Sequence, residues 1–289
     1  MDYYERFSED LKLRGYAKRS RQSYLRTVHQ FQNYCSKPLE EITEADLRKY
    51  WLCCKDDLKW SPATIRISYS GIKHFFTYTI KRDWSVFSQF KLETSHSLPV
   101  VLSVDEARTI LAAFPEGQNR TFFETVYSLG LRLTEARTLQ VRDIDSDRML
   151  VHVHAGKGAK DRLVPLPETT LKALRCYWTT HRNPKWLFPA LGHDGKGGRT
   201  AEKPASETAV QGALRRVCAK LGFRKHVRTH TFRHSYATHL IEAGVPVRHV
   251  QEYLGHDTLA STMVYLHLTT AGREESRSRI NQLMRGVSS

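Results

Sequence analysis

The sequence predicts a mainly α protein with a small β-hairpin or sheet, in which a helical bundle precedes a mixed α+β part. Apolar residues recur at helical spacing along most of the 289-residue chain. One β-prone pair of segments lies between residues 149 and 166, around a Gly-Lys-Gly turn. A proline-containing stretch separates two strongly helical regions, so we expect a bundle over residues 1–93, a linker over 94–99 and a second domain over 100–289.

Four helices are predicted in the first part, at residues 4–13, 20–35, 43–51 and 61–76. The helix over 20–35 places Tyr24, Val28 and Phe31 on one face. Thr43 begins a capping box, and Ser61 is an N-cap followed by proline at the first helical position. Short loops between these helices favour a compact bundle. Its basic residues can contact DNA phosphates or form a solvated helix face; the candidates are Lys18, Arg19, Arg21, Arg66 and Lys73.

In the second part, helices are predicted at residues 103–114 and 121–129, before strands at 149–154 and 161–166. Ser103 to Glu106 forms a second capping box, and the two strands form a hairpin. Further helices follow at residues 167–177, 206–222, 231–243, 247–254 and 259–267, with a long glycine-rich loop over 190–204. A short charged helix is expected over residues 273–284.

The composition excludes several classes of protein. The chain has 45 Lys and Arg against 30 Asp and Glu, a net charge of +15, of which residues 1–98 carry +5 and residues 99–289 carry +10. This balance favours nucleic acid as a partner over a ribosome or membrane surface. Neither a signal peptide nor an apolar run of roughly 18 residues occurs, so we expect a cytoplasmic protein without a membrane partner. Five scattered cysteines favour reduced thiols.

Two arginines and two histidines occur in settings that suit phosphate chemistry. Arg132 lies in an apolar stretch where a purely structural charge would be costly to bury. Phosphodiester transfer adds negative charge to the nonbridging oxygens, which guanidinium groups bind in pairs. His230 and Arg233 are three residues apart and share a helix face, and His256 follows a predicted helix end at Gly255. Each residue taken singly also suits a structural role.

Tyr265 and Lys157 complete this set of candidates. Tyr265 lies nine residues after His256 on a predicted helix, where a tyrosine is ordinarily a core residue. As a nucleophile its phenol needs a base or cations nearby, because its ordinary pKa is about 10. Lys157 lies between two glycines at the tip of the hairpin, where a lysine is either solvated or able to approach DNA closely.

These segments resemble the tyrosine recombinase (phage integrase) family, most closely its Xer-like bacterial members. The resemblance covers nearly the whole chain, and its motifs stand in the family's order: residues 129–135 (LGLRLTE), 156–158 (GKG), 230–234 (HTFRH), 254–256 (LGH) and Tyr265. It implies that residues 1–93 form a SAM-like core-binding domain that contacts DNA. Residues 100–289 would then be the α+β catalytic domain with a C-terminal helix.

The resemblance also implies a role for each motif residue. Arg132 and Arg233 would clamp the scissile phosphate, with Glu135 supporting Arg132. Tyr265 would attack the phosphorus, giving a 3′-phosphotyrosyl bond and a free 5′-hydroxyl without metal, ATP or other cofactor. His230 would be the proton acceptor, and His256 would donate a hydrogen bond to the phosphate. Lys157 would protonate the leaving oxygen, with Lys160 as the nearby alternative, while His234 and His239 would be supportive.

The implied partner is double-stranded DNA with inverted-repeat sites, bound by a dimer on each site and a tetramer in the synapse. That partner suits a nucleoid-associated integrase, including one from a mobile element; an integron role is less favoured but open. The 273–284 helix would dock into a neighbouring protomer or remain solvated. Alternatives are a helix-turn-helix regulator using residues 247–267 and a type IB topoisomerase. A metal enzyme is disfavoured because the sequence has no H-E-x-x-H or comparable spacing.

Overall fold

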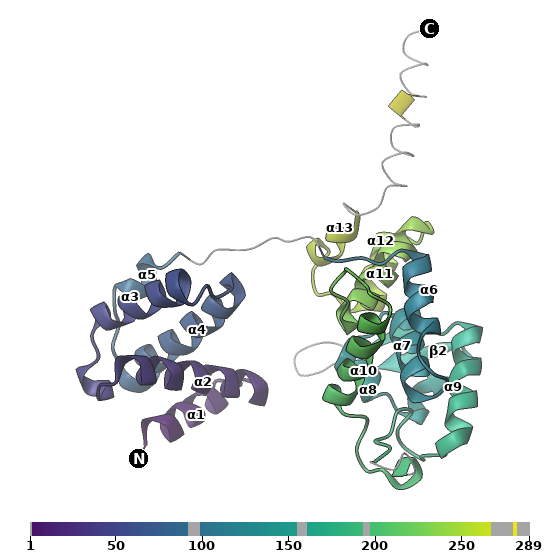
Figure 1. Ribbon diagram of the computed structural model, residues 1–289, viewed down its shortest axis with the longest axis horizontal. Helices are drawn as coiled ribbons and strands as arrows, with labels where there is room; N and C mark the ends of the chain where they lie inside the picture. Colours follow the sequence, from purple (N-terminus) through teal and green to yellow (C-terminus); the bar gives the residue numbers. More distant parts are fainter. Residues whose placement is uncertain (1, 92–98, 155–160, 193–196, 267–279, 282–289) are drawn as a thin grey trace. The chain divides into compact units, whose positions relative to one another are not determined.

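A computed structural model describes residues 2–91, 99–154, 161–192, 197–266 and 280–281 of the chain (Figure 1). The chain divides into two compact units, Met1–Ser97 and Leu98–Ser289. Each unit is described by itself below. The predicted acid Lys157, its alternative Lys160 and nearly all of the predicted helix over 273–284 lie outside the described residues.

The first unit is all helical, as predicted. Its helices are α1 (Tyr3–Leu13), α2 (Lys18–Cys35), α3 (Glu44–Leu52), α4 (Pro62–His74) and the short α5 (Val86–Gln89). A 3-10 turn, Leu39–Glu41, precedes α3, and π-helical segments continue α3 over Cys53–Asp57 and α4 over Phe75–Ile80. The single-turn α5 was not predicted, because four residues are too few to show a helical period.

Side-chain caps begin α3 and α4 where the sequence predicts them. The backbone amide of Thr43 donates to Oδ2 of Asp46 over 2.9 Å, and the amide of Asp46 donates back to Oγ1 of Thr43 over 3.4 Å. Oγ of Ser61 accepts from the amide of Thr64 over 3.2 Å, with proline at the first helical position. Such caps satisfy amides that have no partner within the helix.

Aromatic side chains fill the core between these helices. Phe7, Phe31, Phe75 and Phe76 are at most 1% exposed, and the rings of Phe7 and Phe75 meet edge to face at 5.1 Å between centroids. The longest two helices, α2 and α4, pack against each other along their length. This packing presents the outer faces of α2 and α4 on one side of the unit.

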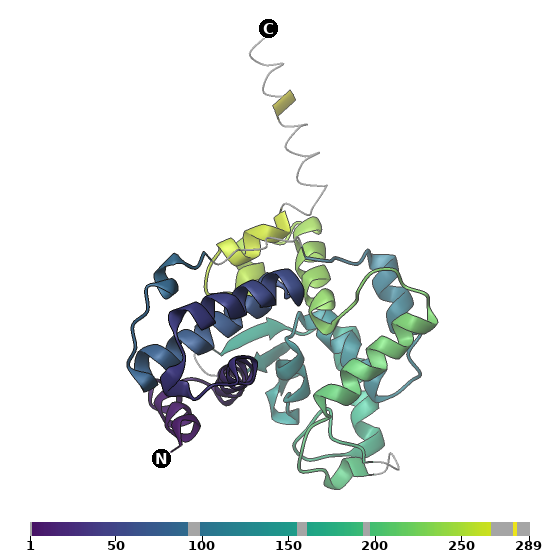
Figure 2. The same cartoon turned by 60° about the vertical axis from the view of Figure 1, so that its left-hand side comes forward.

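The second unit is mixed α+β, with a small sheet among its helices (Figure 2). Helices α6 (Val104–Ala112), α7 (Gln118–Leu129) and α8 (Leu133–Arg137) precede the sheet, and helices α9 (Glu168–His181), α10 (Glu207–Lys220), α11 (Thr229–Glu242), α12 (Val247–Leu254) and α13 (Ala260–Leu266) follow it. A 3-10 turn, Gly197–Thr200, interrupts the predicted loop over 190–204. No described helix is long and apolar enough to cross a bilayer.

The sheet has three antiparallel strands, β1 (Ile144–Asp145), β2 (Leu150–Val153) and β3 (Arg162–Pro165). The predicted hairpin corresponds to β2 and β3, while β1 is too short to show alternation and was not predicted. Val151 pairs with Val164, and both are fully buried against the core of the unit. Because side chains alternate along a strand, this pairing determines which residues of the hairpin face inward.

Candidate active site

The C-terminal ends of α7 and α12 bring the predicted motif residues to one place beside α11. Gly130 ends α7 with φ +60°, and a Cβ there would lie 2.4 Å from Cδ1 of Tyr236. Gly255 ends α12 with φ +62° and lies against Arg162. Glycine therefore supplies both the left-handed turn and the close packing that direct Arg132 and His256 into the site.

Three guanidinium groups surround the carboxylate of Glu135, which is 8% exposed. Nη1 of Arg132 lies 2.7 Å from Oε1, and Arg162 donates to both oxygens over 3.0 and 2.8 Å. Nη1 of Arg233 lies 3.8 Å from Oε2. Burial alone would raise the pKa of Glu135, but hydrogen bonds from Arg162 and Arg132 outweigh it and lower the pKa to about 2. Glu135 is therefore an anion that offsets the repulsion among the three cations.

Arg233 is almost completely buried, and its Nη atoms donate to main-chain carbonyls that end two helices. The acceptors are the oxygen of Gly130, over 2.8 Å, and the oxygen of Leu254. Burial, with Arg132 nearby, lowers the pKa of Arg233 to about 9, so it remains a cation at neutral pH. The Arg132 side chain is 36% exposed and donates to the oxygen of Gly255 over 3.2 Å. A rigid buried cation thus lies beside one that solvent and ligands can reach.

Arg162 is a member of this cluster that the sequence analysis missed. It pairs with Val153 in the sheet, on the inner face, and its Nε donates to the oxygen of Tyr253 over 2.7 Å. Its side chain is 7% exposed. Arg162 therefore links the sheet, Glu135 and the end of α12. The signal was the strand alternation itself, which places Arg162 on the same side as the buried valines.

Tyr265 is 3% exposed, and its phenol oxygen lies 2.8 Å from Nδ1 of His234. Its ring packs with Ala237, Val250 and Leu254 in a small apolar cluster. Burial raises the pKa of Tyr265, and the guanidinium groups of Arg233 and Arg132 oppose that rise. Burial, together with His230 and Arg233, lowers the pKa of His234 to about 4, so this imidazole is neutral at physiological pH and can accept a proton.

His256 lies beside the tyrosine, and His230 lies beside His234, which contacts the phenol. Nδ1 of His256 lies 2.9 Å from Oγ1 of the buried Thr262, and its ring stacks at 6.2 Å from that of Tyr265. Burial and the nearby arginines lower the pKa of His256 to about 4. His230 lies on α11, one turn before His234; the residue is exposed, but neighbouring protein atoms displace part of the water around its ring, and this desolvation together with Arg233 lowers its pKa. Both rings are therefore neutral at physiological pH.

The structure thus brings together Arg132, Glu135, His230, Arg233, His256 and Tyr265. His234, rather than His230, is the histidine that contacts the phenol oxygen. No local pattern in the sequence predicts this contact, because it joins a residue of α11 to a residue of α13. His239, the other supportive histidine, lies 2.8 Å from the hydroxyl of Tyr127 and 2.9 Å from the oxygen of Leu102.

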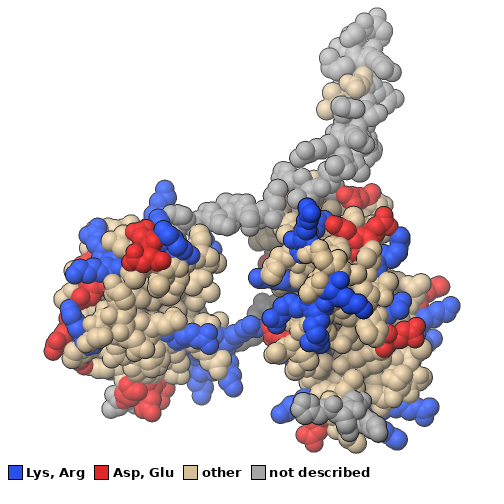
Figure 3. All heavy atoms as spheres, in the orientation of Figure 1, with Lys and Arg blue, Asp and Glu red and all other residues tan. Residues whose placement is uncertain are grey.

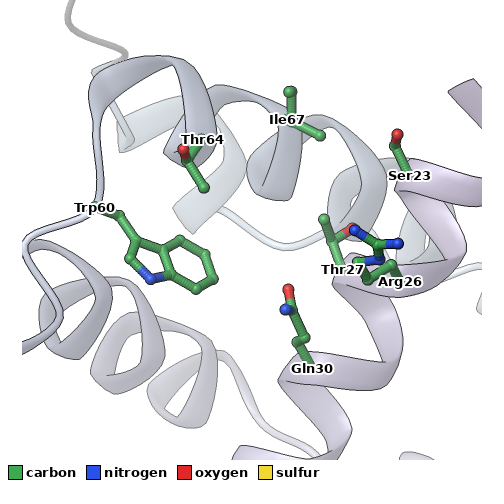
Figure 4. A pocket seen from close by; sticks show the side chains of 7 residues that line it. All are labelled: Ser23, Arg26, Thr27, Gln30, Trp60, Thr64 and Ile67. Atoms are coloured by element: carbon green, nitrogen blue, oxygen red, sulfur yellow. The ribbon is translucent and has the colours of Figure 1, made fainter. Parts of the chain in front are cut away.

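The predicted DNA contacts of the first unit all lie on α2 and α4. Lys18, Arg19 and Arg66 are exposed, whereas Arg21 and Lys73 are partly buried. A cavity of about 360 Å³ opens between the two helices. Figure 4 shows Arg26 and Gln30, which the sequence analysis did not select, opposite residues of α4 and Trp60; the cavity is lined by Ser23, Arg26, Thr27, Gln30, Trp60, Thr64 and Ile67.

Basic side chains are spread over both units (Figure 3). On the visible face of the second unit they gather into a group with few acidic side chains among them. The net charge of +15 is therefore distributed over both folded parts. A surface of this kind attracts a polyanion irrespective of its sequence.

Comparison with known proteins agrees with this geometry. Residues 100–271 match the phage integrase family, and residues 3–86 match the N-terminal SAM-like domain of phage integrases. An integrase/recombinase of Sinorhizobium fredii is 36% identical over 92% of this chain and 84% of its own length. A tyrosine recombinase of Thermosipho africanus is 32% identical over 91% of this chain and 94% of its own.

Solved structures share the fold. XerH recombinase bound to its palindromic difH substrate superposes with a TM-score of 0.72 at 21% identity, over 95% of this chain and 84% of that one. A lambda integrase dimer bound to a core site superposes with a TM-score of 0.73 at 18% identity, over 91% of this chain and 75% of that one. With a buried tyrosine and clustered arginines at the centre of such a fold, the chain belongs to the phage integrase family of Xer-like tyrosine recombinases.

Proposed function

We propose that this protein is a site-specific DNA recombinase that cleaves and rejoins strands through a 3′-phosphotyrosyl intermediate. The observation that carries the proposal is the meeting of a buried tyrosine with a neutral histidine on its phenol and two phosphate-binding arginines beside it. A DNA-binding regulator has no use for that combination. The proposed partner of this protein is double-stranded DNA. The XerH structure bound to its difH substrate and the lambda integrase structure bound to a core site support this choice.

In the cleavage step, the Tyr265 oxygen attacks the scissile phosphorus. The bond from phosphorus to tyrosine forms as the bond from phosphorus to the 5′-oxygen breaks, so the phosphodiester's bond energy is kept for rejoining. Arg132 and Arg233 bind the nonbridging oxygens, whose negative charge grows in the transition state. Because Glu135 and three main-chain carbonyls already orient these cations, little reorganisation is needed when the phosphate arrives.

The histidines have different roles: one accepts the phenol proton, and another donates a hydrogen bond to the phosphate. We assign the phenol proton to His234, because its Nδ1 already lies within hydrogen-bond distance of that oxygen and its imidazole is neutral at physiological pH. His230, the acceptor predicted from the family, is the second candidate for this proton and lies one turn away on the exposed side. We assign Nδ1 of His256 as the acceptor of the Thr262 hydroxyl, an assignment that leaves the proton on Nε2 for a hydrogen bond to phosphate.

Protonation of the leaving 5′-oxygen is assigned to Lys157, with Lys160 as the alternative. The strands that flank their segment end at Val153 and begin at Arg162. We call Arg132, Glu135, Arg162 and Arg233 the phosphate-binding cluster. Since Arg162 binds Glu135 directly, the hairpin is anchored at this cluster. This anchoring supports a role in the same site for a lysine carried between these strands.

DNA recognition by the first unit is assigned to the α2–α4 face. The predicted contacts Lys18, Arg19 and Arg66 are exposed there, and Arg26 and Gln30 add donors along the groove between the helices. Cations on this face would bind backbone phosphates, while the amide of Gln30 suits a base edge. Arg21 and Lys73 stay candidates at the margin of the face. We therefore propose that the first unit is the core-binding domain.

Action on two inverted-repeat sites requires a dimer on each site and a tetramer in the synapse. We assign residues 273–289 to contacts between protomers, and we propose that the protein acts on the nucleoid or as part of a mobile element. Deleting residues 273–289 should then reduce cooperative binding to a full site while leaving binding to a half-site unchanged. Equal cooperativity with and without this segment would remove the assignment.

The decisive experiment uses a nicked suicide substrate, in which the cleaved strand cannot be rejoined. Wild-type protein incubated with cognate site DNA should accumulate a covalent adduct that resists denaturation, in the presence of a chelator and without ATP. Tyr265→Phe should form none while still binding the DNA. An adduct that persists in Tyr265→Phe would refute the proposal, and relaxation of plasmid lacking the site would indicate a topoisomerase instead.

A further inference from the structure

Two histidines and an aspartate lie together on the outer face of the hairpin, opposite the active-site face. The register of β2 and β3 pairs Val153 with Arg162, and both of these side chains face inward. Because side chains alternate, His152 and His154 face outward. Continuing the same register by one step places Asp161 directly across from His154.

The ligand atoms of these three residues converge. Nε2 of His152 lies 3.1 Å from Oδ2 of Asp161, and Nδ1 of His154 lies 3.1 Å from the same oxygen. All three ligand atoms lie within 4.8 Å of one another, and the two imidazole rings are 4.2 Å apart between centroids. An ion bound at about 2.0–2.2 Å from each ligand needs only a small closure of this triangle.

A buried carboxylate orients one of the two histidines. Nε2 of His154 lies 3.0 Å from Oδ1 of Asp143, whose side chain is 2% exposed. The other oxygen of Asp143 accepts from the amide of Gln140 over 2.8 Å, which fixes the carboxylate in place. When Nε2–H donates to Asp143, the lone pair of Nδ1 is left to bind an ion that Oδ2 of Asp161 would share. This carboxylate–histidine pairing is the arrangement that positions a metal ligand in protein sites.

We propose that His152, His154 and Asp161 form a binding site for a divalent transition metal ion, of which Zn²⁺ is the expected occupant. Two imidazole nitrogens and one carboxylate oxygen suit Zn²⁺, whereas Mg²⁺ and Ca²⁺ prefer all-oxygen ligand sets. Three protein ligands leave the fourth tetrahedral position open to water or to an additional group. All three ligands are at least partly accessible, so the ion can enter from solvent.

The location gives the ion a structural consequence. It would tie the end of β2 to the start of β3, across the ends of the segment 155–160. Metal binding should therefore raise the thermal stability of the hairpin, because it stabilises only the folded arrangement of the ligands. The site is separate from the phosphate-binding cluster, so the inference does not depend on the proposed function.

Metal binding is tested on the full chain after dialysis against a chelator, by titration calorimetry with ZnCl₂. The wild type should bind one Zn²⁺ with a dissociation constant in the micromolar range or below, and His152→Gln should lose this site. Asp143→Asn keeps all three ligands but removes the carboxylate behind His154, so its affinity should fall by about 10–100-fold. His249→Gln changes an exposed histidine outside the cluster and should bind like the wild type.

Co²⁺ provides a spectroscopic probe of the ligands. Tetrahedral Co²⁺ bound by nitrogen and oxygen should give visible d–d absorption that His152→Gln abolishes, without the near-ultraviolet thiolate band that cysteine ligands produce. A thiolate band would place the ion on cysteines and overturn the inference. Equal Zn²⁺ affinity in wild type and His152→Gln, with both folded by circular dichroism, would also overturn it.

Discussion

The phenol oxygen of Tyr265 lies 2.8 Å from Nδ1 of His234, and the tyrosine ring is buried in a small apolar cluster. Arg233 and Arg132 act on the same phenol and oppose the effect of its burial. The tyrosine is therefore held by a neutral base within a positively charged site. This contact decides which histidine meets the nucleophile before DNA binds.

The first prediction separates the two candidate bases. His234→Gln should reduce single-turnover cleavage of the suicide substrate by roughly 10²–10⁴-fold, because the proton acceptor on the phenol is lost. His230→Gln is the matched variant on the same helix and should be less impaired at pH 7. The opposite order of the two variants would return the role to His230.

Arg162 should contribute strongly to the stability of the folded protein, although it is not among the motif residues that carry the family resemblance. Arg162→Gln leaves Glu135 with fewer cations in a buried position, so the free energy of unfolding should fall by about 3–5 kcal/mol. The exposed pair of Arg148 with Asp145 provides the control, since Arg148→Gln should cost about 0–1 kcal/mol. Urea unfolding measures both values. Equal losses would show that Arg162 is not part of a buried network.

Acid should weaken the fold through Glu135. Its pKa is about 2 in the folded protein and near 4.5 when unfolded, so the unfolded state binds a proton first as the pH falls. The stabilisation is fully present above pH 4.5 and should be lost between about pH 4.5 and pH 2, amounting to at most about 3 kcal/mol. The difference in unfolding free energy between wild type and Glu135→Gln should shrink across that range. A constant difference would contradict the assignment.

Cations of the two units should differ in their effect on DNA binding. Arg132→Ala should abolish cleavage while retaining most of the salt-dependent affinity. Arg26→Ala, on the α2–α4 face, should lower affinity and reduce the slope of log affinity against log salt by about 1. Lys12→Ala on α1 is the control with an exposed cation elsewhere in the unit. Fluorescence anisotropy at several salt concentrations measures the slopes, and equal slopes for Arg26→Ala and Lys12→Ala would count against the proposed face.

His239 should prove structural rather than catalytic. It connects the Tyr127 hydroxyl on α7 to the carbonyl of Leu102, so His239→Leu should leave both groups short of a partner. We expect a loss of about 1–3 kcal/mol in unfolding free energy. Cleavage per folded molecule should stay near the wild-type rate. A folded variant with a large loss of cleavage would contradict this role.

The sequence by itself determined the helices and the order of the motif residues. Caps at Thr43, Ser61 and Ser103, and the glycines that end α7 and α12, are local signals, so the corresponding helix ends could be predicted. The hairpin could also be predicted, because two β-prone segments and the Gly-Lys-Gly turn between them are local signals. The arginine, histidine and tyrosine motifs were recognisable because family resemblance depends on order and spacing along the chain.

Only the tertiary structure decided which of these groups meet. Arg162 reaches Glu135 from another strand, and His234 reaches Tyr265 from another helix, through packing that no local pattern encodes. The convergence of His152 and His154 on Asp161 likewise depends on the register of the hairpin. A shift of one residue would turn these side chains to the opposite face of the sheet. The physical reason is the same in each case: distances between side chains on different elements follow from how those elements pack.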